Sequence, residues 1–305
     1  MVLPRTVTRA LAFYLMFALF MISAECPSAG SNEDLPPQAP IKNIRLGIIT
    51  LYHPLVMYRN YQPFADYLSE KTPYTVKLKI SENYYQIIDF LSTGTVQAAI
   101  LGGMTYLEAK KKVEITPLLS TLGKDRKPFC RGVFITRNDN ADINTIDDIK
   151  GTHFAFASIH STSGNLMPLY YLYSKTGIRL SDFKSYENLK YHDSVIRNVL
   201  RGNFDAGVAL DTIAGQYKDV GLKYIEKTEP FPGFLLVVRN DLPADIADAI
   251  RRTLLDLDYR NPDHRKIMDT WDVNIRYGFT PTSDRAYDKI QEAVTELSSY
   301  GIEWR

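Results

Sequence analysis

Short apolar runs and stretches with helical apolar spacing alternate along most of the chain. Residues 44–50 are apolar and rich in β-branched side chains, which predicts a buried strand. Residues 74–81 alternate apolar and charged positions, as a half-buried strand does. The first lobe therefore begins as βαβαβα, the pattern of an open parallel sheet covered on both faces. The expected strands cover 44–50, 74–81 and 97–101, and the expected helices begin at Pro63 or cover 84–93 and 105–112.

A second series of strands and helices follows. Its expected strands cover 131–137, 153–158, 204–210 and 234–239, and its expected helices cover 146–149, 164–176 and 194–201, with one opened by Pro243 and a last one carrying Tyr287, Ile290, Val294 and Leu297. A chain of 305 residues is too long for a single core, which predicts two lobes. We expect residues 42–137 in the first lobe, 138–230 in the second, and 231–305 returning to the first. Two crossings near Arg137 and residues 230–234 would form the hinge. Ligands of open α/β sheets bind at the carboxyl ends of strands, here the cleft between the lobes.

The N-terminus has the features of a signal peptide. Arg5 and Arg9 precede an uncharged apolar run over 11–22, and the small residue Ala24 suits cleavage. The run is short for a bilayer span, so an uncleaved anchor is the weaker alternative. Lipidation at Cys26 is disfavoured because Glu25 stands where lipoprotein signals have a small residue. We expect a signal peptide over 1–24, a Pro- and Ser-rich linker over 25–41, and export to the periplasm.

Charge and cysteine content exclude several classes. The formal net charge is +1, which removes the basic face that a nucleic-acid-binding protein needs. Cys26 and Cys130 are the two cysteines, too few for a disulfide scaffold or a four-cysteine metal site. A bridge between them and two separate thiols are both open. The five histidines lack a metal-binding spacing, so neither a metal nor a cofactor is expected.

The most specific local motif is a run of three hydroxyl residues before a glycine. Ser161, Thr162, Ser163 and Gly164 follow a predicted strand and open a predicted helix. A helix N-terminus offers unpaired N–H groups and partial positive charge, and the hydroxyls add directional donors. This arrangement is typical of an anion cradle. The alternative is ordinary helix capping, which needs one such hydroxyl rather than three.

Three further residues stand at loops that are expected to face the cleft. His192 opens another helix, where an imidazole can donate to an anion, and His160 beside the hydroxyl run is a weaker candidate. Asp211 ends a strand and is either a helix cap or an acceptor for a protonated P–OH or a ligand amine. Tyr84 opens a helix of the first lobe. Nucleophile, P-loop and dinucleotide motifs are missing, so we do not expect an enzyme.

The chain resembles the PhnD-like phosphate, phosphite and phosphonate-binding proteins of bacterial ABC transporters over most of its length. The resemblance rests on LGIIT, YRNYQPFADYLSEK, NYYQIIDFLSTGTVQAAILGG, TYLEA, IDDIKGTHFAFASIHSTSG, HDSVIRNVLRGNFDAGVALD and VVRNDLP. It implies a bilobal type II periplasmic-binding-protein fold, a Venus flytrap with two open mixed or parallel sheets, helices on both faces and a two-segment hinge. It also implies that Ser161, Thr162 and Ser163 hold the phosphoryl group of the ligand with help from His192, and that Asp211 and Tyr84 contact the rest of the ligand. Aminophosphonate binders of this family carry an aromatic residue where this chain has Leu101 or Gly102, which disfavours an aminoalkylphosphonate.

The resulting expectation is an exported, monomeric solute-binding protein that delivers a small phosphorus oxyanion to an ABC transporter permease. A periplasmic sensor that reports the oxyanion to a separate membrane protein is the alternative. An enzyme built on the same fold is a third possibility.

Overall fold

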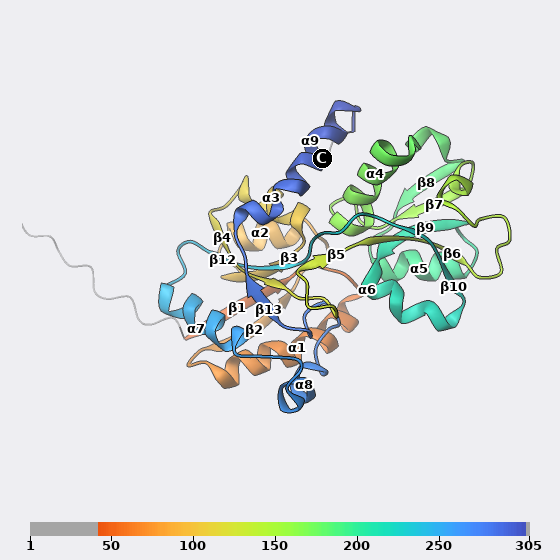
Figure 1. Cartoon of the computed structure of the whole chain (residues 1–305). Coiled ribbons are helices and arrows are strands. Elements are labelled where there is room, and N and C mark those ends of the chain that lie inside the picture. Colours follow the sequence, from red (N-terminus) through yellow and green to blue (C-terminus); the bar gives the residue numbers. More distant parts are fainter. Residues whose placement is uncertain (1–41, 303–305) are drawn as a thin grey trace, which may run out of the picture. The chain divides into compact units, whose positions relative to one another are not determined.

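The computed structural model describes residues 42–302, which form two large β-sheets, a two-stranded ribbon and their helices (Figure 1). The expected signal peptide over 1–24, the linker over 25–41 and Cys26 lie outside the described residues. Within residues 42–302, no helix is both long enough and apolar enough to cross a bilayer.

The first lobe is built on a six-stranded mixed sheet with the strand order β13-β4-β12-β3-β1-β2. β1, β2 and β3 run parallel, as the βαβαβα pattern predicts, and β12 pairs antiparallel with both β3 and β4. Ile44, Leu46 and Ile48 of β1 are buried, and because they alternate along the strand they share one face of the sheet. The strands are β1 (Asn43–Ile48), β2 (Thr75–Ile80), β3 (Ala98–Leu101), β4 (Ile115–Thr121), β12 (Leu235–Arg239) and β13 (Phe279–Pro281).

The second lobe is built on a five-stranded mixed sheet with the order β10-β6-β9-β7-β8. β7 pairs parallel with β8 and β9, whereas β6 is antiparallel to β9 and β10. Phe134, Phe154 and Phe156 are buried in the core of this lobe. The strands are β6 (Gly132–Arg137), β7 (His153–Phe156), β8 (Ser185–Asn188), β9 (Ala206–Leu210) and β10 (Leu222–Lys227).

Helices cover the sheets, and most lie where the apolar spacing predicts them. Ile246, Ile250 and Leu254 form the buried face of α7, and Ile290 and Leu297 belong to that of α9. The helices are α1 (Pro54–Lys71), α2 (Gln86–Ser92), α3 (Gly103–Lys110), α4 (Met167–Tyr171), α5 (His192–Leu200), α6 (Asp211–Ala214), α7 (Ala244–Leu255), α8 (Pro262–Met268) and α9 (Asp288–Ser299).

Helix α1 corrects the predicted start at Pro63. The helix begins nine residues earlier at Pro54, and Pro63 lies inside it. The missing N–H of Pro63 removes one helical hydrogen bond. Burial of one continuous stripe that includes Met57, Tyr61 and Leu68 offsets that loss.

The chain crosses from the first sheet to the second before Arg137, where the crossing was predicted. β6, which was assigned to the first lobe, pairs with β9 and β10 of the second, so the first crossing lies between β4 and β6. The return crossing lies between β10 and β12, near the predicted place. Two short strands in these crossings pair antiparallel, β5 (Phe129–Cys130) with β11 (Phe231–Pro232). We call this pair the hinge ribbon.

The helix predicted over 164–176 is α-helical only in its middle. π-helical turns over Thr162–Leu166 and Leu172–Thr176 flank α4. Pro168 has no N–H to donate to the Gly164 carbonyl four residues back. That carbonyl instead accepts from the Ala157 N–H at 2.9 Å, which ties the start of the helix to the end of β7.

Candidate functional site

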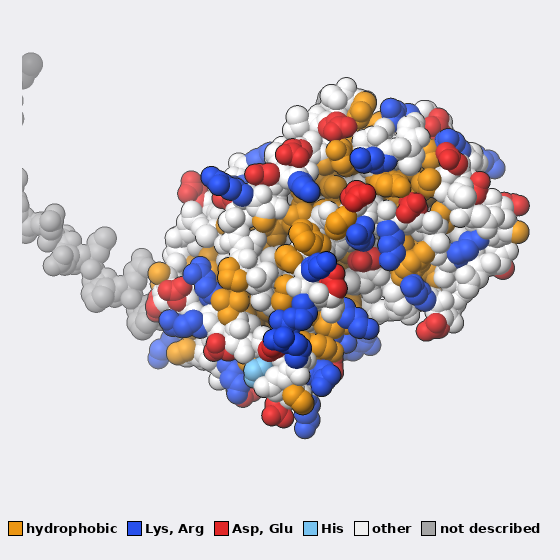
Figure 2. Space-filling model, in the orientation of Figure 1, with side chains coloured by type: hydrophobic (Ala, Val, Ile, Leu, Met, Phe, Trp, Pro, Cys, Tyr) orange, Lys and Arg blue, Asp and Glu red, His pale blue; other side chains and the backbone are white. Residues whose placement is uncertain are grey.

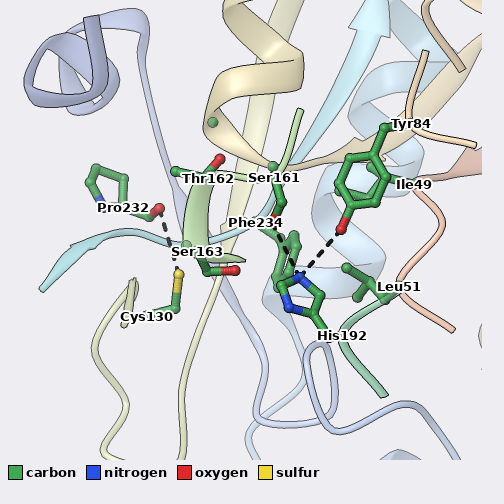
Figure 3. Close-up of a pocket in the computed structure, with 13 residues that line it drawn as sticks. Ile49, Leu51, Tyr84, Cys130, Ser161, Thr162, Ser163, His192, Pro232 and Phe234 are labelled. Carbon is green, nitrogen blue, oxygen red and sulfur yellow. Dashed lines mark hydrogen bonds between the residues drawn. The ribbon is translucent and has the colours of Figure 1, made fainter. Parts of the chain in front are cut away.

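Five of the six candidate residues line one small cavity between the two lobes (Figure 3). Tyr84 comes from the first lobe, and Ser161, Thr162, Ser163 and His192 come from the second. The cavity has a volume of about 10 Å³, which is room for about one water molecule. Its other lining residues are Ile49, Leu51, Gly102, Gly103, Cys130, Pro232, Gly233 and Phe234.

The three consecutive hydroxyl residues, Ser161, Thr162 and Ser163, line the cavity on the side of the second lobe. Ser161 caps the π-helical turn, because its Oγ accepts a hydrogen bond from the Gly164 N–H at 3.0 Å. Gly164 has no side chain, and a Cβ there would stand 2.7 Å from His192 Cε1. Because Gly164 has no Cβ, the His192 imidazole can pack directly against the π-helical turn.

His192 is a neutral hydrogen-bond donor fixed by its surroundings. The Leu210 N–H donates to His192 Nδ1 at 3.1 Å, so the proton of the neutral ring is on Nε2. Nε2 lies 3.2 Å from Ser161 Oγ and 3.3 Å from the Tyr84 hydroxyl (Figure 3). Burial lowers the pKa of His192 to about 3, because the charged ring would lose its hydration.

Contacts across the lobes surround the cavity. The Met104 N–H of α3 donates to Thr162 Oγ1 at 2.9 Å, and the His192 N–H donates to the Leu51 carbonyl at 3.3 Å. Tyr84 is buried, and burial raises the pKa of its hydroxyl, which therefore stays protonated at neutral pH. The described structure thus has its two lobes in contact around the candidate site.

Asp211 is not among the residues that line the cavity, and its role as a ligand contact stays a prediction. It is the first residue of α6, and its Oδ1 accepts from the Thr212 N–H at 2.8 Å, so it serves the helix start. Burial raises the pKa of this carboxyl. His160, the weaker histidine candidate, is also outside the cavity and pairs with Glu108 of the first lobe at 2.9 Å.

Apart from Tyr84, sequence reasoning missed the residues on the first-lobe and hinge side of the cavity. Gly102 and Gly103 carry a detectable signal, since a glycine pair follows a strand and opens α3. Cys130 and Phe234 carry none, because they come from the two hinge crossings, and only the fold brings these together.

The cavity combines polar and apolar groups without a charged side chain. Its lining includes no Asp, Glu, Lys or Arg side chain, and acidic and basic side chains are interspersed on the face in Figure 2. Two helix starts meet at the cavity: α3, whose Gly102 cap has no side chain, and the turn that Ser161 caps. Their N–H groups supply partial positive charge. Among residues 42–302, no group of three His, Cys, Asp or Glu side chains could hold a metal ion.

The family described as "ABC transporter, phosphonate, periplasmic substrate-binding protein" matches residues 46–287. The chain belongs to this family. Its members are solute-binding proteins of ABC transporters rather than enzymes, and they work with a membrane permease from the periplasmic side.

Curated relatives match most of the chain. A probable ABC transporter phosphite-binding protein, PhnD1, of Prochlorococcus marinus strain MIT 9301 is 24% identical, covering 84% of this chain and 90% of the relative. The phosphonates-binding periplasmic protein of Escherichia coli strain K12 is 25% identical, covering 95% of this chain and 80% of the relative.

The solved structures support the predicted fold. PhnD1 of Prochlorococcus marinus in complex with methylphosphonate is similar with a TM-score of 0.75 at 23% identity, covering 84% of this chain and 98% of that one. A binding-protein component of an ABC phosphonate transporter from Pseudomonas aeruginosa gives a TM-score of 0.74 at 23% identity, covering 85% and 86%. The fold is therefore that of a type II periplasmic binding protein, as predicted.

Proposed function

We propose that this protein captures a small phosphorus oxyanion, namely phosphite, a phosphonate or phosphate, in the cavity between its lobes and delivers it to an ABC permease. The observation that carries the proposal is the cluster of buried donors: three consecutive hydroxyls on a helix start, with a neutral imidazole and a tyrosine beside them. The relatives are named for phosphite and phosphonate binding, which agrees with that chemistry.

The ligand's oxygens would take over hydrogen bonds that the site now makes internally. His192 Nε2 lies 3.2 Å from Ser161 Oγ and 3.3 Å from the Tyr84 hydroxyl. An entering oxyanion separates them and accepts from each. Ser163 is 5% exposed and its hydroxyl has no hydrogen-bond partner among the described residues, so it is available to the ligand.

Closure of the lobes excludes water and strengthens each of these bonds. Tyr84 joins donors of the second lobe only when the lobes meet, so the bound oxyanion favours the closed form through contacts that the open form lacks. The closed form is the one that the permease recognises. One chain supplies the whole cavity, which supports a monomer as the working unit.

A calorimetric titration tests the proposal. Purified protein is titrated with phosphite, methylphosphonate, phosphate and sulfate, and the double variant Ser161→Ala, Ser163→Ala is titrated in parallel. We expect the phosphorus oxyanions to bind the wild type and the variant to lose at least about 100-fold in affinity, because two donors to a charged group are lost.

The control is Ser92→Ala, since the Ser92 hydroxyl contacts only the Asp89 carbonyl on an exposed part of α2. This variant should bind like the wild type. Wild-type protein that binds none of the four anions, or a double variant of unchanged affinity, contradicts the proposal. Melting curves confirm that the variants are folded.

A further inference from the structure

Helix α3 of the first lobe contacts the second-lobe segment 160–162, where the hydroxyl run begins. The Thr105 hydroxyl of α3 donates to the His160 carbonyl at 3.4 Å. Glu108 of the same helix lies with its Oε1 at 2.9 Å from His160 Nδ1. Both contacts join the lobes at the residue that immediately precedes Ser161 in the chain. They therefore form only when the lobes meet, and they hold the segment that carries the first hydroxyl of the site.

The contact between Glu108 and His160 is a sheltered hydrogen bond. A carboxylate can only accept, so Nδ1 of His160 carries the proton of this bond. The exposed fractions of the two side chains are 21% for Glu108 and 16% for His160. The Tyr85 ring lies beside the imidazole, with 5.8 Å between the ring centroids. Because little water reaches the pair, its hydrogen bond is stronger than that of an exposed pair.

The second carboxylate oxygen of Glu108 has no compensation of this kind. Glu108 Oε2 is buried and lacks a hydrogen-bond partner among the described residues. Lys112, which attracts the Glu108 charge, is exposed and donates to the Tyr85 hydroxyl instead. An unpaired polar atom removed from water costs free energy, and a charged one costs more. That cost belongs to the closed form, because separation of the lobes removes His160 and its loop from Glu108 and admits water to the carboxylate.

We infer that Glu108 and His160 are positioning residues that form a balanced latch between the lobes. The hydrogen bond of the pair favours closure, and the unpaired Glu108 Oε2 opposes it. Neither residue lines the cavity, so the pair affects oxyanion binding through closure and through the position of Ser161, without touching the ligand. The inference rests on the proposed function, because it concerns the closure that a bound oxyanion stabilises.

A balanced latch makes closure depend on the ligand. A latch with only favourable contacts would close the empty protein, and a partner that recognises the closed form could not distinguish empty from loaded molecules. When bond and cost nearly cancel, the contacts that the oxyanion makes across the lobes decide the equilibrium. The latch then lowers the apparent affinity by the fraction of molecules that are open, and a change that relieves its cost raises that affinity.

The variant Glu108→Gln tests the cost of the unpaired oxygen. Its amide oxygen still accepts from His160 Nδ1–H, but the side chain is neutral, so burying its second polar atom costs less. Without ligand, electron paramagnetic resonance between labels on the two lobes should show more of the closed form. Phosphite should bind about threefold to tenfold more tightly, which loss of a merely structural contact would not produce. Glu70→Gln is the matched control, since exposed Glu70 pairs only with its neighbour Lys71, and it should match the wild type.

Two variants of His160 test the hydrogen bond. His160→Phe keeps a ring beside Tyr85 but has no donor, so both oxygens of Glu108 lose their partners in the closed form. The lobes should then open, and phosphite should bind about tenfold more weakly. His160→Asn places an N–H donor where Nδ1 lies and should restore binding to the wild-type level.

The outcomes separate the latch from the proposed function. The balance is overturned if Glu108→Gln neither closes further without ligand nor binds phosphite more tightly. The role of the hydrogen bond is overturned if His160→Phe and His160→Asn bind phosphite equally well. Wild-type protein that binds no oxyanion contradicts the proposed function, while the ligand-free distances still test the latch. If melting curves show that His160→Phe is unfolded, Glu108→Gln still decides.

Discussion

Thr162 of the second lobe caps a helix of the first. Its Oγ1 accepts a hydrogen bond at 2.9 Å from the N–H of Met104, the second residue of α3. The N-cap position of α3 itself is Gly102, which has no side chain to offer. A Cβ on Gly102 would stand 3.3 Å from Thr162 Oγ1, so the glycine also makes room for this hydroxyl. The helix is capped in this way only when the lobes are in contact.

We predict that Thr162→Val opens the lobes. Valine keeps the shape but leaves the buried Met104 N–H without an acceptor, which costs about 1–2 kcal/mol in the closed form alone. The distance between labels on the two lobes, measured by electron paramagnetic resonance, should shift toward open forms. Thr162→Ser retains the hydroxyl and should match the wild type; equal distance distributions for valine and serine variants would refute the coupling.

We predict that His192 makes the protein sensitive to acid. Its pKa is about 3 in the folded protein and close to 6.5 in the unfolded chain, so between these values the unfolded chain binds a proton that the folded one does not. Stability contributed by neutral His192 is therefore complete above pH 6.5 and is lost as pH falls toward 3. The free energy of unfolding should drop by up to about 1.4 kcal/mol per pH unit from this group.

Urea unfolding at several pH values between 7.5 and 4.5 measures this drop. His192→Gln cannot titrate, so its free energy of unfolding should fall less steeply over the same range. The slope difference between the two proteins isolates His192 from the carboxyl groups that they share. Parallel curves would show that the imidazole is not held neutral by burial.

We predict that Gly164→Ala damages the site. The new Cβ would meet Ala157 Cβ and would stand 2.7 Å from His192 Cε1, so the imidazole must move away from Ser161. Overpacking of this kind costs about 1–3 kcal/mol of stability, and phosphite binding should weaken with it. Chemical unfolding and calorimetry measure the two effects.

Gly215→Ala is the matched control. Gly215 has ordinary helical dihedrals, with φ of −57°, and a Cβ there would meet only the Tyr224 hydroxyl at 3.8 Å. Alanine should be neutral or slightly stabilising at this position, because it restricts the unfolded chain. Equal effects of the two substitutions would mean that close packing at Gly164 does not position His192.

Local patterns predicted most of the elements. Periodicity located β1, β2, α7 and α9 because each buries one face, and burial imposes a period of two or about 3.6 on the residues. The start of α1 was missed because Pro63 looks like a helix start, and only the packed stripe behind it shows that the helix continues through it. β4 was not predicted at all: Pro117 interrupts its pattern, and a register shift opposite, at Leu236 and Val237, accommodates it.

The residues of the candidate site likewise divide into those that local patterns identify and those that only tertiary packing places. Ser161, Thr162 and Ser163 were identifiable because a helix start is a local structure, and its donors follow from neighbouring residues alone. The direction of Asp211 could not be predicted, because a residue at the end of a strand can turn toward the cleft or toward its own helix, as it does here. Which way it turns depends on what packs around it.

The sequence by itself determined the alternation of strands and helices and the hydroxyl-bearing helix start, since each depends on residues close together in the chain. The length of the chain was enough to indicate two lobes. The tertiary structure alone decided that Tyr84 meets His192, that Thr162 caps α3, and that Cys130 and Phe234 wall the cavity. These relationships join residues as much as 108 positions apart, as for Tyr84 and His192. Such contacts depend on how the two lobes pack, and no local period or spacing in the chain encodes that packing.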